Sequence, residues 1–135
     1  MTKLYPHNDS IKTVIKNCAD FVVKDGLNYL IPQWEKFTNS VDENDGSTSD
    51  EYLNDLDIRK IIDTILSLLS EQERDRIISV IDFYDKQFIS KTFAVKDCMW
   101  GRKNELIHGF TRQNHFYYYR APQYIIDQSR DIVKL

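Results

Sequence analysis

The most constraining feature of the chain is a long apolar segment, LDIRKIIDTILSLLS at residues 56–70. Its apolar side chains cover more than half of a helix circumference, so the segment predicts the central and most buried helix of the fold. These side chains are Ile58, Ile61, Ile62, Ile65, Leu66, Leu68 and Leu69. A helix that is apolar on so many sides needs other helices around it, which favours a bundle.

A second amphipathic helix follows directly. The residues SEQE at 70–73 form a capping box, in which Ser70 and Glu73 satisfy each other's free backbone amides. The helix is expected to run from Glu71 to about Ile89, with Ile77, Ile78, Ile81, Tyr84 and Phe88 facing inward. The short connection at Ser70 makes it an antiparallel partner of the preceding helix.

Two further helices are expected before residue 42. Residues 10–24 carry apolar side chains at helical spacing, and Gly26 is a plausible stop. A second stripe follows at Leu30, Trp34, Phe37 and Val41. Pro32 is expected in the first turn of that helix, or at a kink.

The last third of the chain has a different pattern. TFAVKDCMW at 92–100 lacks helical periodicity, and HFYYYRAP at 115–122 alternates weakly before Pro122. We expect a short extended or β segment near 113–120, and one more short helix in QYIIDQSRDIV. The predicted fold is therefore mainly α, with four or five helices in one domain covering residues 1–135.

Composition narrows the function classes. No stretch reaches the roughly 18 to 20 apolar residues of a membrane span, and no apolar leader follows Met1, so we expect a cytoplasmic protein that binds no membrane. Cys18 and Cys98 are expected to be reduced, buried thiols. No metal-ligand spacing and no glycine-rich phosphate loop occurs, so no metal and no cofactor is predicted. His7 lies in an N-terminal segment expected to be flexible.

Charge is unevenly distributed along the chain. Residues 1–85 hold 9 Lys and Arg against 17 Asp and Glu, whereas residues 86–135 hold 9 against 4. The strongest acidic run is 42–57, where seven carboxylates occur with no Lys or Arg: Asp42, Glu43, Asp45, Asp50, Glu51, Asp55 and Asp57. Residues 42–51 are expected to form a solvated loop. The run either binds a basic partner, with Tyr52 as a buried anchor of that interface, or is a solvated linker, and the two charged halves could also pair with each other.

The sequence GRKNELIHGF at 101–110 suggests an enzymatic alternative. The spacing of Arg102 and His108 resembles the Arg-x(4–6)-His motif of the HEPN ribonucleases, helical proteins that dimerise to build a composite site. In that family a polar residue, often Asn, follows the arginine directly. Here Lys103 lies between Arg102 and Asn104, so the arginine is displaced by one position or is replaced by lysine. The resemblance implies metal-independent RNA cleavage by Arg102 and His108.

The run FYYYRAP at 116–122 has two interpretations. Aromatic side chains next to basic ones can stack bases and bind phosphate, and such a platform would consist of Arg112, His115, Tyr117, Tyr119 and Arg120. The favoured alternative is structural: in an extended segment, Phe116 and Tyr118 would face the core while Tyr117 and Tyr119 would cover a helix pair.

A broader resemblance runs from LLSEQERDRIISVIDFYDKQFISKTF through MWG to FYYYRAP. It is similar to a pattern in small uncharacterised bacterial proteins. The chain also resembles, in its general properties and not in a motif, the immunity proteins of contact-dependent growth inhibition and other polymorphic toxin systems. The shared properties are small size, acidic character and few cysteines. That resemblance implies a non-enzymatic protein that binds a cognate toxin, a basic nuclease domain, and occludes its active site without contacting nucleic acid itself. A transcription-linked adaptor remains a third hypothesis, and the oligomeric state is left open.

Overall fold

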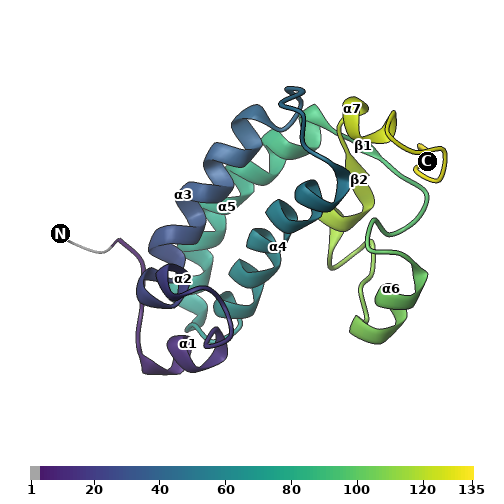
Figure 1. The fold of residues 1–135 in the computed structure, drawn as a ribbon. Coiled ribbons are helices and arrows are strands. Elements are labelled where there is room, and N and C mark those ends of the chain that lie inside the picture. The colour runs from purple at the N-terminus through teal and green to yellow at the C-terminus, as the bar shows by residue number, and fades with distance from the viewer. Residues whose placement is uncertain (1–3) are drawn as a thin grey trace.

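The computed structural model describes residues 4–135. Three long helices form the central part of the molecule: α3 (Leu27–Ser40), α4 (Ser49–Leu66) and α5 (Glu71–Lys91). Shorter elements stand at the two ends of this group (Figure 1). They are α1 (Asp9–Val14), α2 (Asp20–Asp25), β1 (Phe93–Ala94), α6 (Arg102–His108), the 3₁₀ helix η1 (Phe116–Tyr119), β2 (Arg120–Ala121) and α7 (Gln123–Ile126). The prediction of a mainly helical fold with a short β segment near the C-terminus is confirmed.

The three long helices share α3 as their common neighbour. α3 packs against both α4 and α5, and α4 and α5 run in opposite directions as the short connection between them predicts (Figure 1). α1 and α2 lie at one end of the group, and the two strands, α6 and α7 lie at the other. In the region from residue 4 to residue 135, none of the helices has both the length and the apolar composition needed to cross a bilayer.

The N-terminal segment forms two helices instead of the single helix expected over 10–24. Asn8 caps α1 by accepting a hydrogen bond from the amide of Ile11 at 3.0 Å, and the helix stops at Ile15. The chain then turns and restarts at Asp20. Ile11, Ile15 and Val22 are buried, whereas Val14 and Phe21 of the same predicted stripe are exposed. The flexibility expected for His7 is also wrong, because its Nε2 lies 2.8 Å from the carbonyl oxygen of Val23.

Gly26 joins α2 to α3 with a φ of +55°, a conformation that residues with a Cβ atom rarely adopt. The predicted stop at this glycine is confirmed. α3 begins immediately after it, at Leu27, so Pro32 lies inside the helix and not in its first turn. Leu30, Trp34 and Val41 are buried as their stripe predicts.

α4 begins earlier than the apolar stripe suggested. Thr48 and Glu51 form a complete capping box, with the Thr48 hydroxyl accepting from the Glu51 amide at 3.2 Å and Glu51 Oε1 accepting from the Thr48 amide at 3.3 Å. The last three residues of the expected 42–51 loop therefore belong to the first turn of a helix. The same helix ends at Leu66, and Leu68, expected inside, is 44% exposed.

The aromatic run forms a 3₁₀ turn, so the extended conformation expected over 113–120 is wrong for most of its length. Only Arg120 and Ala121 are extended, and they pair antiparallel with Ala94 and Phe93. Val95 forms one further bridge with Lys134. A 3₁₀ turn points consecutive side chains about 120° apart, so the burial of Tyr117, Tyr118 and Tyr119 together means that other parts of the chain surround this turn.

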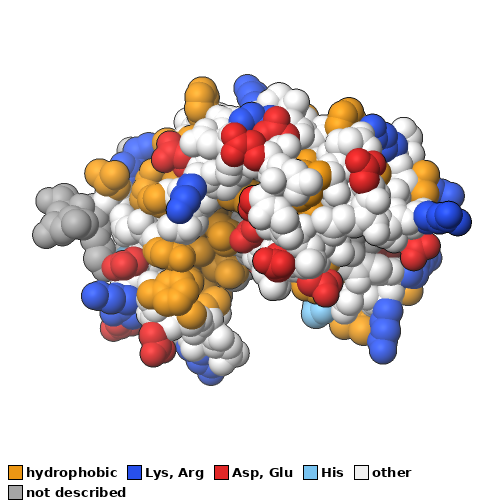
Figure 2. Space-filling model, turned by 45° about the horizontal axis from the view of Figure 1, so that its top comes forward, with side chains coloured by type: hydrophobic (Ala, Val, Ile, Leu, Met, Phe, Trp, Pro, Cys, Tyr) orange, Lys and Arg blue, Asp and Glu red, His pale blue; other side chains and the backbone are white. Residues whose placement is uncertain are grey.

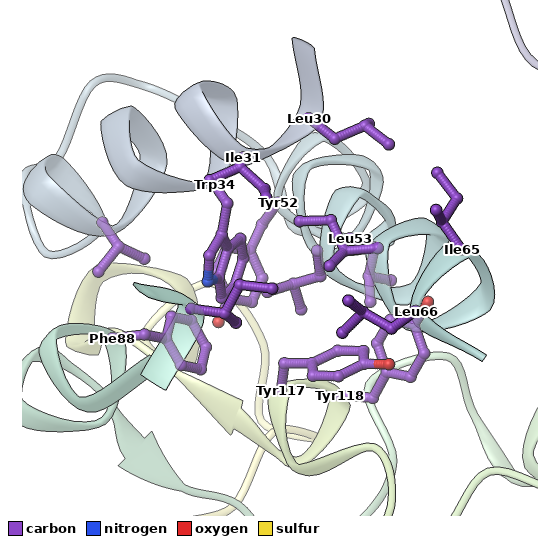
Figure 3. Packing of buried hydrophobic residues seen from close by; sticks show 14 of the residues in the cluster. Leu30, Ile31, Trp34, Tyr52, Leu53, Ile65, Leu66, Phe88, Tyr117 and Tyr118 are labelled. Atoms are coloured by element: carbon purple, nitrogen blue, oxygen red, sulfur yellow. The ribbon is translucent and has the colours of Figure 1, made fainter. Parts of the chain in front are cut away.

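Large aromatic side chains from different helices meet in the core. Trp34 packs against Phe88 with ring centroids 5.4 Å apart, and Tyr52 lies close to both in Figure 3. Tyr117 and Tyr118 lie beneath Leu66 in the same view. The aromatic run thus closes one side of the three-helix group.

Candidate functional site

Five carboxylates form the acidic surface of the molecule. Asp42, Glu43 and Asp45 lie on the loop between α3 and α4, and Asp50 and Glu51 lie in the first turn of α4; all five are exposed. Asp and Glu side chains stand across the middle of the face drawn in Figure 2. We refer to these five residues as the acidic segment.

The loop that carries the acidic segment is held by hydrogen bonds. Asn44 Oδ1 accepts from the amide of Gly46 at 3.1 Å, and Asp45 Oδ1 accepts from the amide of Ser47 at 2.9 Å. Gln128 Nε2 donates to the Ser47 carbonyl at 2.7 Å, which ties the loop to the C-terminal region. The carboxylates are therefore presented on a defined backbone.

Negative charge accumulates around this loop. Within residues 4–135, the one cation within 4.0 Å of the acidic segment is Lys91, whose Nζ lies 3.9 Å from Asp42 Oδ1. Hydrogen bonds from Ser47 lower the pKa of Asp45. Burial raises the pKa of Asp55, and the charges of Asp45 and Glu51 raise it further. The acidic segment therefore keeps most of its charge uncompensated.

Tyr52 does not belong to this surface, and its expected role as an interface anchor is wrong. Its side chain is 1% exposed, because helical spacing turns it toward α3 while Glu51 faces solvent. Its hydroxyl donates to the Arg120 carbonyl at 2.7 Å. Tyr52 therefore joins α4 to β2.

The other two acids of 42–57 lie on different sides of α4. Asp55 is half-buried near the acidic segment, whereas Asp57 is half-buried against the aromatic run and accepts from the Tyr118 hydroxyl at 2.7 Å. Burial raises the pKa of Asp57, against the hydrogen bond from Tyr118. The structure thus brings six of the seven acids together and places Asp57 elsewhere.

A cavity of about 470 Å³ borders the acidic segment at Asp50. Three more acids line it from distant parts of the chain: Asp97, Glu105 and Asp131. Arg102 also lines it and lies 3.7 Å from Glu105. The cavity carries negative charge beyond the loop toward the C-terminal region.

Arg102 and His108 occupy the two ends of α6 and do not form one site within the chain. Six residues of helix separate their side-chain directions by about 240°. Arg102 lines the cavity beside Asp50, whereas His108 lines a different groove and stacks on Phe110 at a centroid distance of 5.2 Å. Both side chains are exposed. The ribonuclease hypothesis therefore needs a second copy to complete a site.

The tyrosines at 117–119 are structural, as the favoured interpretation of FYYYRAP predicts, and the alternative of a base-stacking platform is wrong. Each hydroxyl donates to a carboxylate: Tyr117 to Asp63 at 3.0 Å, Tyr118 to Asp57, and Tyr119 to Glu105. Burial and these carboxylates raise the pKa of all three hydroxyls. Arg112 and Arg120 are likewise used internally: Arg112 lies over the Tyr119 ring, and Arg120 donates to Thr92.

A buried ion pair links α4 to α5. Arg59 donates through Nε to Asp85 Oδ1 at 3.0 Å and through Nη2 to Oδ2 at 2.9 Å, and the Trp34 indole donates to the same Oδ1 at 2.9 Å. Arg59 also pairs with Asp63. Burial lowers the pKa of Arg59, but the hydrogen bonds and charges of Asp85 and Asp63 outweigh it and raise the pKa. The sequence signal for this pair is Asp85 itself, a carboxylate that interrupts the apolar stripe of Ile77, Ile81 and Phe88.

The cysteines and possible metal ligands add no second site. Cys98 is buried, Cys18 is half-buried, and both are free thiols whose pKa is raised by burial. Over residues 4–135, no three His, Cys, Asp or Glu side chains are grouped so that they could hold a metal ion.

No protein-family model, no curated protein and no solved structure matches this chain.

Proposed function

We propose that this chain is a non-enzymatic, cytoplasmic immunity protein that neutralises a cognate toxin by covering a basic active site with its acidic segment. The observation that carries the proposal is the set of five exposed carboxylates on a hydrogen-bonded loop and the first turn of α4, with one lysine within 4.0 Å among the residues described. A surface of this kind steers a basic partner and repels a nucleic-acid backbone.

The partner chemistry follows from the same charges. A nuclease toxin holds its substrate in a basic concave site, and the five carboxylates of the acidic segment complement such a site. The cavity beside Asp50 supports the proposal, because Asp97, Glu105 and Asp131 extend the acidic region inward. A basic side chain that entered there would meet carboxylates from three separate segments.

The first experiment is a pull-down of the tagged full chain from lysate of its own organism, washed at moderate salt, with mass spectrometry of the retained proteins. The proposal predicts one stoichiometric basic protein whose nuclease activity stops on binding. Recovery of only self-associated chain or of RNA would instead favour Arg102 and His108.

The second experiment tests the surface with that captured protein. The acidic segment is changed to amides (Asp42→Asn, Glu43→Gln, Asp45→Asn, Asp50→Asn, Glu51→Gln), which preserve the acceptor oxygens of the turn and the cap. The association rate is expected to fall about tenfold or more at low salt, and the difference is expected to shrink as salt rises.

A matched control removes the same charge elsewhere, through amides at the exposed acids Asp9, Asp20, Glu71, Asp75 and Asp82. The control is expected to associate several times faster than the acidic-segment variant. Equal association rates and equal salt dependence for the two variants would show that the acidic segment is not the binding surface.

A further inference from the structure

A groove of about 430 Å³ lies between α4 and α6, farther along α4 than the acidic segment, none of whose five residues lines it. It is lined by Asp57, Lys60, Ile61, Trp100, Asn104, His108, Phe110 and Tyr118. Its volume falls within the roughly 300–1,000 Å³ of ligand pockets. Aromatic walls and a few polar groups together are typical of a site that binds a small planar ligand.

The walls of the groove are three aromatic rings held at fixed angles. Phe110 packs against Tyr118 with centroids 4.7 Å apart, and Trp100 meets Tyr118 edge to face at 6.5 Å. Tyr118 is 1% exposed, whereas Trp100 and Phe110 are half-buried and line the groove. Trp100 and Phe110 therefore offer ring surface on which a planar ligand can stack.

Two polar groups of the groove are already used by the protein. Asp57 accepts from the Tyr118 hydroxyl at 2.7 Å, so it holds one wall in place. Asn104 Nδ2 donates to the Trp100 carbonyl at 2.9 Å. This bond uses one of the two N–H groups of the amide and orients the side chain, and Asn104 Oδ1 can accept a hydrogen bond from a ligand. An acceptor of this kind favours a ring with an exocyclic amino group.

Two side chains of the groove, Lys60 and His108, can donate hydrogen bonds to an anion. Lys60 has no ion-pair partner within 4.0 Å in the part of the chain that the structure describes, although Asp57 is near enough for its charge to be felt. His108 is exposed at the C-terminal end of α6. Residues 86–135 carry an excess of Lys and Arg over Asp and Glu. An anion at Lys60 and His108 is therefore compatible with its surroundings.

We propose that this groove binds a nucleotide, with an amino-bearing base, adenine or cytosine, stacked on Trp100 and Phe110 and the phosphate at Lys60 and His108. A nucleotide combines in one molecule the planar ring, the amino group and the anion that the groove recognises. The site does not overlap the acidic segment, so it stands whether or not the chain neutralises a toxin.

The test follows the indole resonances of the two tryptophans by NMR during titration of the full chain with AMP. Trp34 is fully buried and bonded to Asp85, so its resonance serves as an internal reference. The Trp100 resonance is expected to shift saturably while that of Trp34 stays fixed. Adenosine, which lacks the phosphate, and UMP, which lacks the amino group, are each expected to bind several-fold more weakly.

A pair of variants tests the role of charge. Lys60→Gln is expected to weaken AMP binding about tenfold and to leave adenosine unaffected, since only the phosphate loses a partner. Lys103→Gln removes the same charge from an exposed position of α6 outside the groove and is expected to have no effect on AMP binding.

Two results would overturn the proposal: a Trp100 resonance that does not saturate below about 10 mM AMP, or equal loss of AMP binding in Lys60→Gln and Lys103→Gln. A short adenine oligoribonucleotide separates the two sources of the ligand. Tenfold tighter binding than AMP would identify an RNA strand, and equal binding would identify a free nucleotide. Neither outcome depends on a toxin, so failure here is distinguishable from failure of the acidic segment.

Discussion

The Arg59–Asp85 pair provides a quantitative test of how the three long helices are held. Both side chains are 10% exposed, and the two hydrogen bonds of the guanidinium to the carboxylate are 2.9 and 3.0 Å long. One substitution at each partner removes the ion pair. Arg59→Met keeps the volume of the side chain and removes its charge, and Asp85→Asn keeps an oxygen that accepts from the Trp34 indole.

Each single substitution leaves one charge buried without its partner. Breaking a buried pair in this way costs about 3–5 kcal/mol. We expect a value near the lower end, about 3 kcal/mol, because Asp63 still pairs with Arg59 when Asp85 is changed and because Trp34 still donates to position 85. The double variant leaves neither position 59 nor position 85 charged, and Asp63, which also loses Arg59, is 34% exposed and keeps the hydrogen bond from Tyr117. The double variant is therefore expected to cost no more than either single substitution.

The measurement is urea unfolding of the four proteins, followed by tryptophan fluorescence, with the slope m checked for constancy. The expected coupling between the two positions is about 3 kcal/mol. Arg102→Met is the matched control, because Arg102 is 81% exposed and its ion pair with Glu105 is worth about 0–1 kcal/mol. A double variant that costs the sum of the two single variants would refute the reasoning.

Three further outcomes are expected. Tyr52→Phe removes a buried hydrogen bond to the Arg120 carbonyl and is expected to lower the free energy of unfolding by about 1 kcal/mol. The association rate with a basic partner should stay unchanged, and slower association would show that Tyr52 contributes to the interface. Gly26→Ala is expected to lower the free energy of unfolding, measured by chemical denaturation, by at least about 1 kcal/mol, because φ is +55° and the added Cβ would lie 2.5 Å from His7 Nδ1. Adding His7→Ala should recover part of this loss, and effects of the two substitutions that simply add would contradict the contact. Burial lowers the pKa of His115 below 6.5, so the unfolded chain binds more protons than the folded chain just below pH 6.5. The free energy of unfolding should therefore fall as pH drops from about 6.5 toward the folded pKa. In His115→Gln this part of the pH dependence should disappear, and an unchanged dependence of the free energy of unfolding on pH would assign it to another group.

Helix boundaries illustrate how far local sequence information extends. Gly26 was recognisable because glycine alone tolerates its φ. The start of α4 at Ser49 was also encoded locally, since Thr48 and Glu51 have the capping-box spacing, but the acidic run around them favoured a loop. The break between α1 and α2 has no comparable local signal. Ile11, Ile15 and Val22 would lie on one face of a continuous helix as well, so their spacing does not reveal the break.

The candidate sites also differ in how far local sequence reveals them. The carboxylates of the acidic segment are consecutive enough in sequence to be found as a charge run, and the structure leaves all five exposed. The groove between α4 and α6 could not be found in this way, because Lys60 and Trp100 come from segments with no local relation. The aromatic run was conspicuous, yet its three tyrosines are buried once a 3₁₀ turn replaces the expected extended segment.

By itself the sequence determined the helical class, the stripes that face the core and the acidic run, because these depend on spacing along one chain. Only the tertiary structure decided that Tyr52 is buried, that Arg102 and His108 face different cavities, and that Asp85 meets Arg59. Each of these outcomes depends on which distant part of the chain a side chain packs against. The packing of whole helices decides this contact, and the neighbours of the residue in the sequence do not.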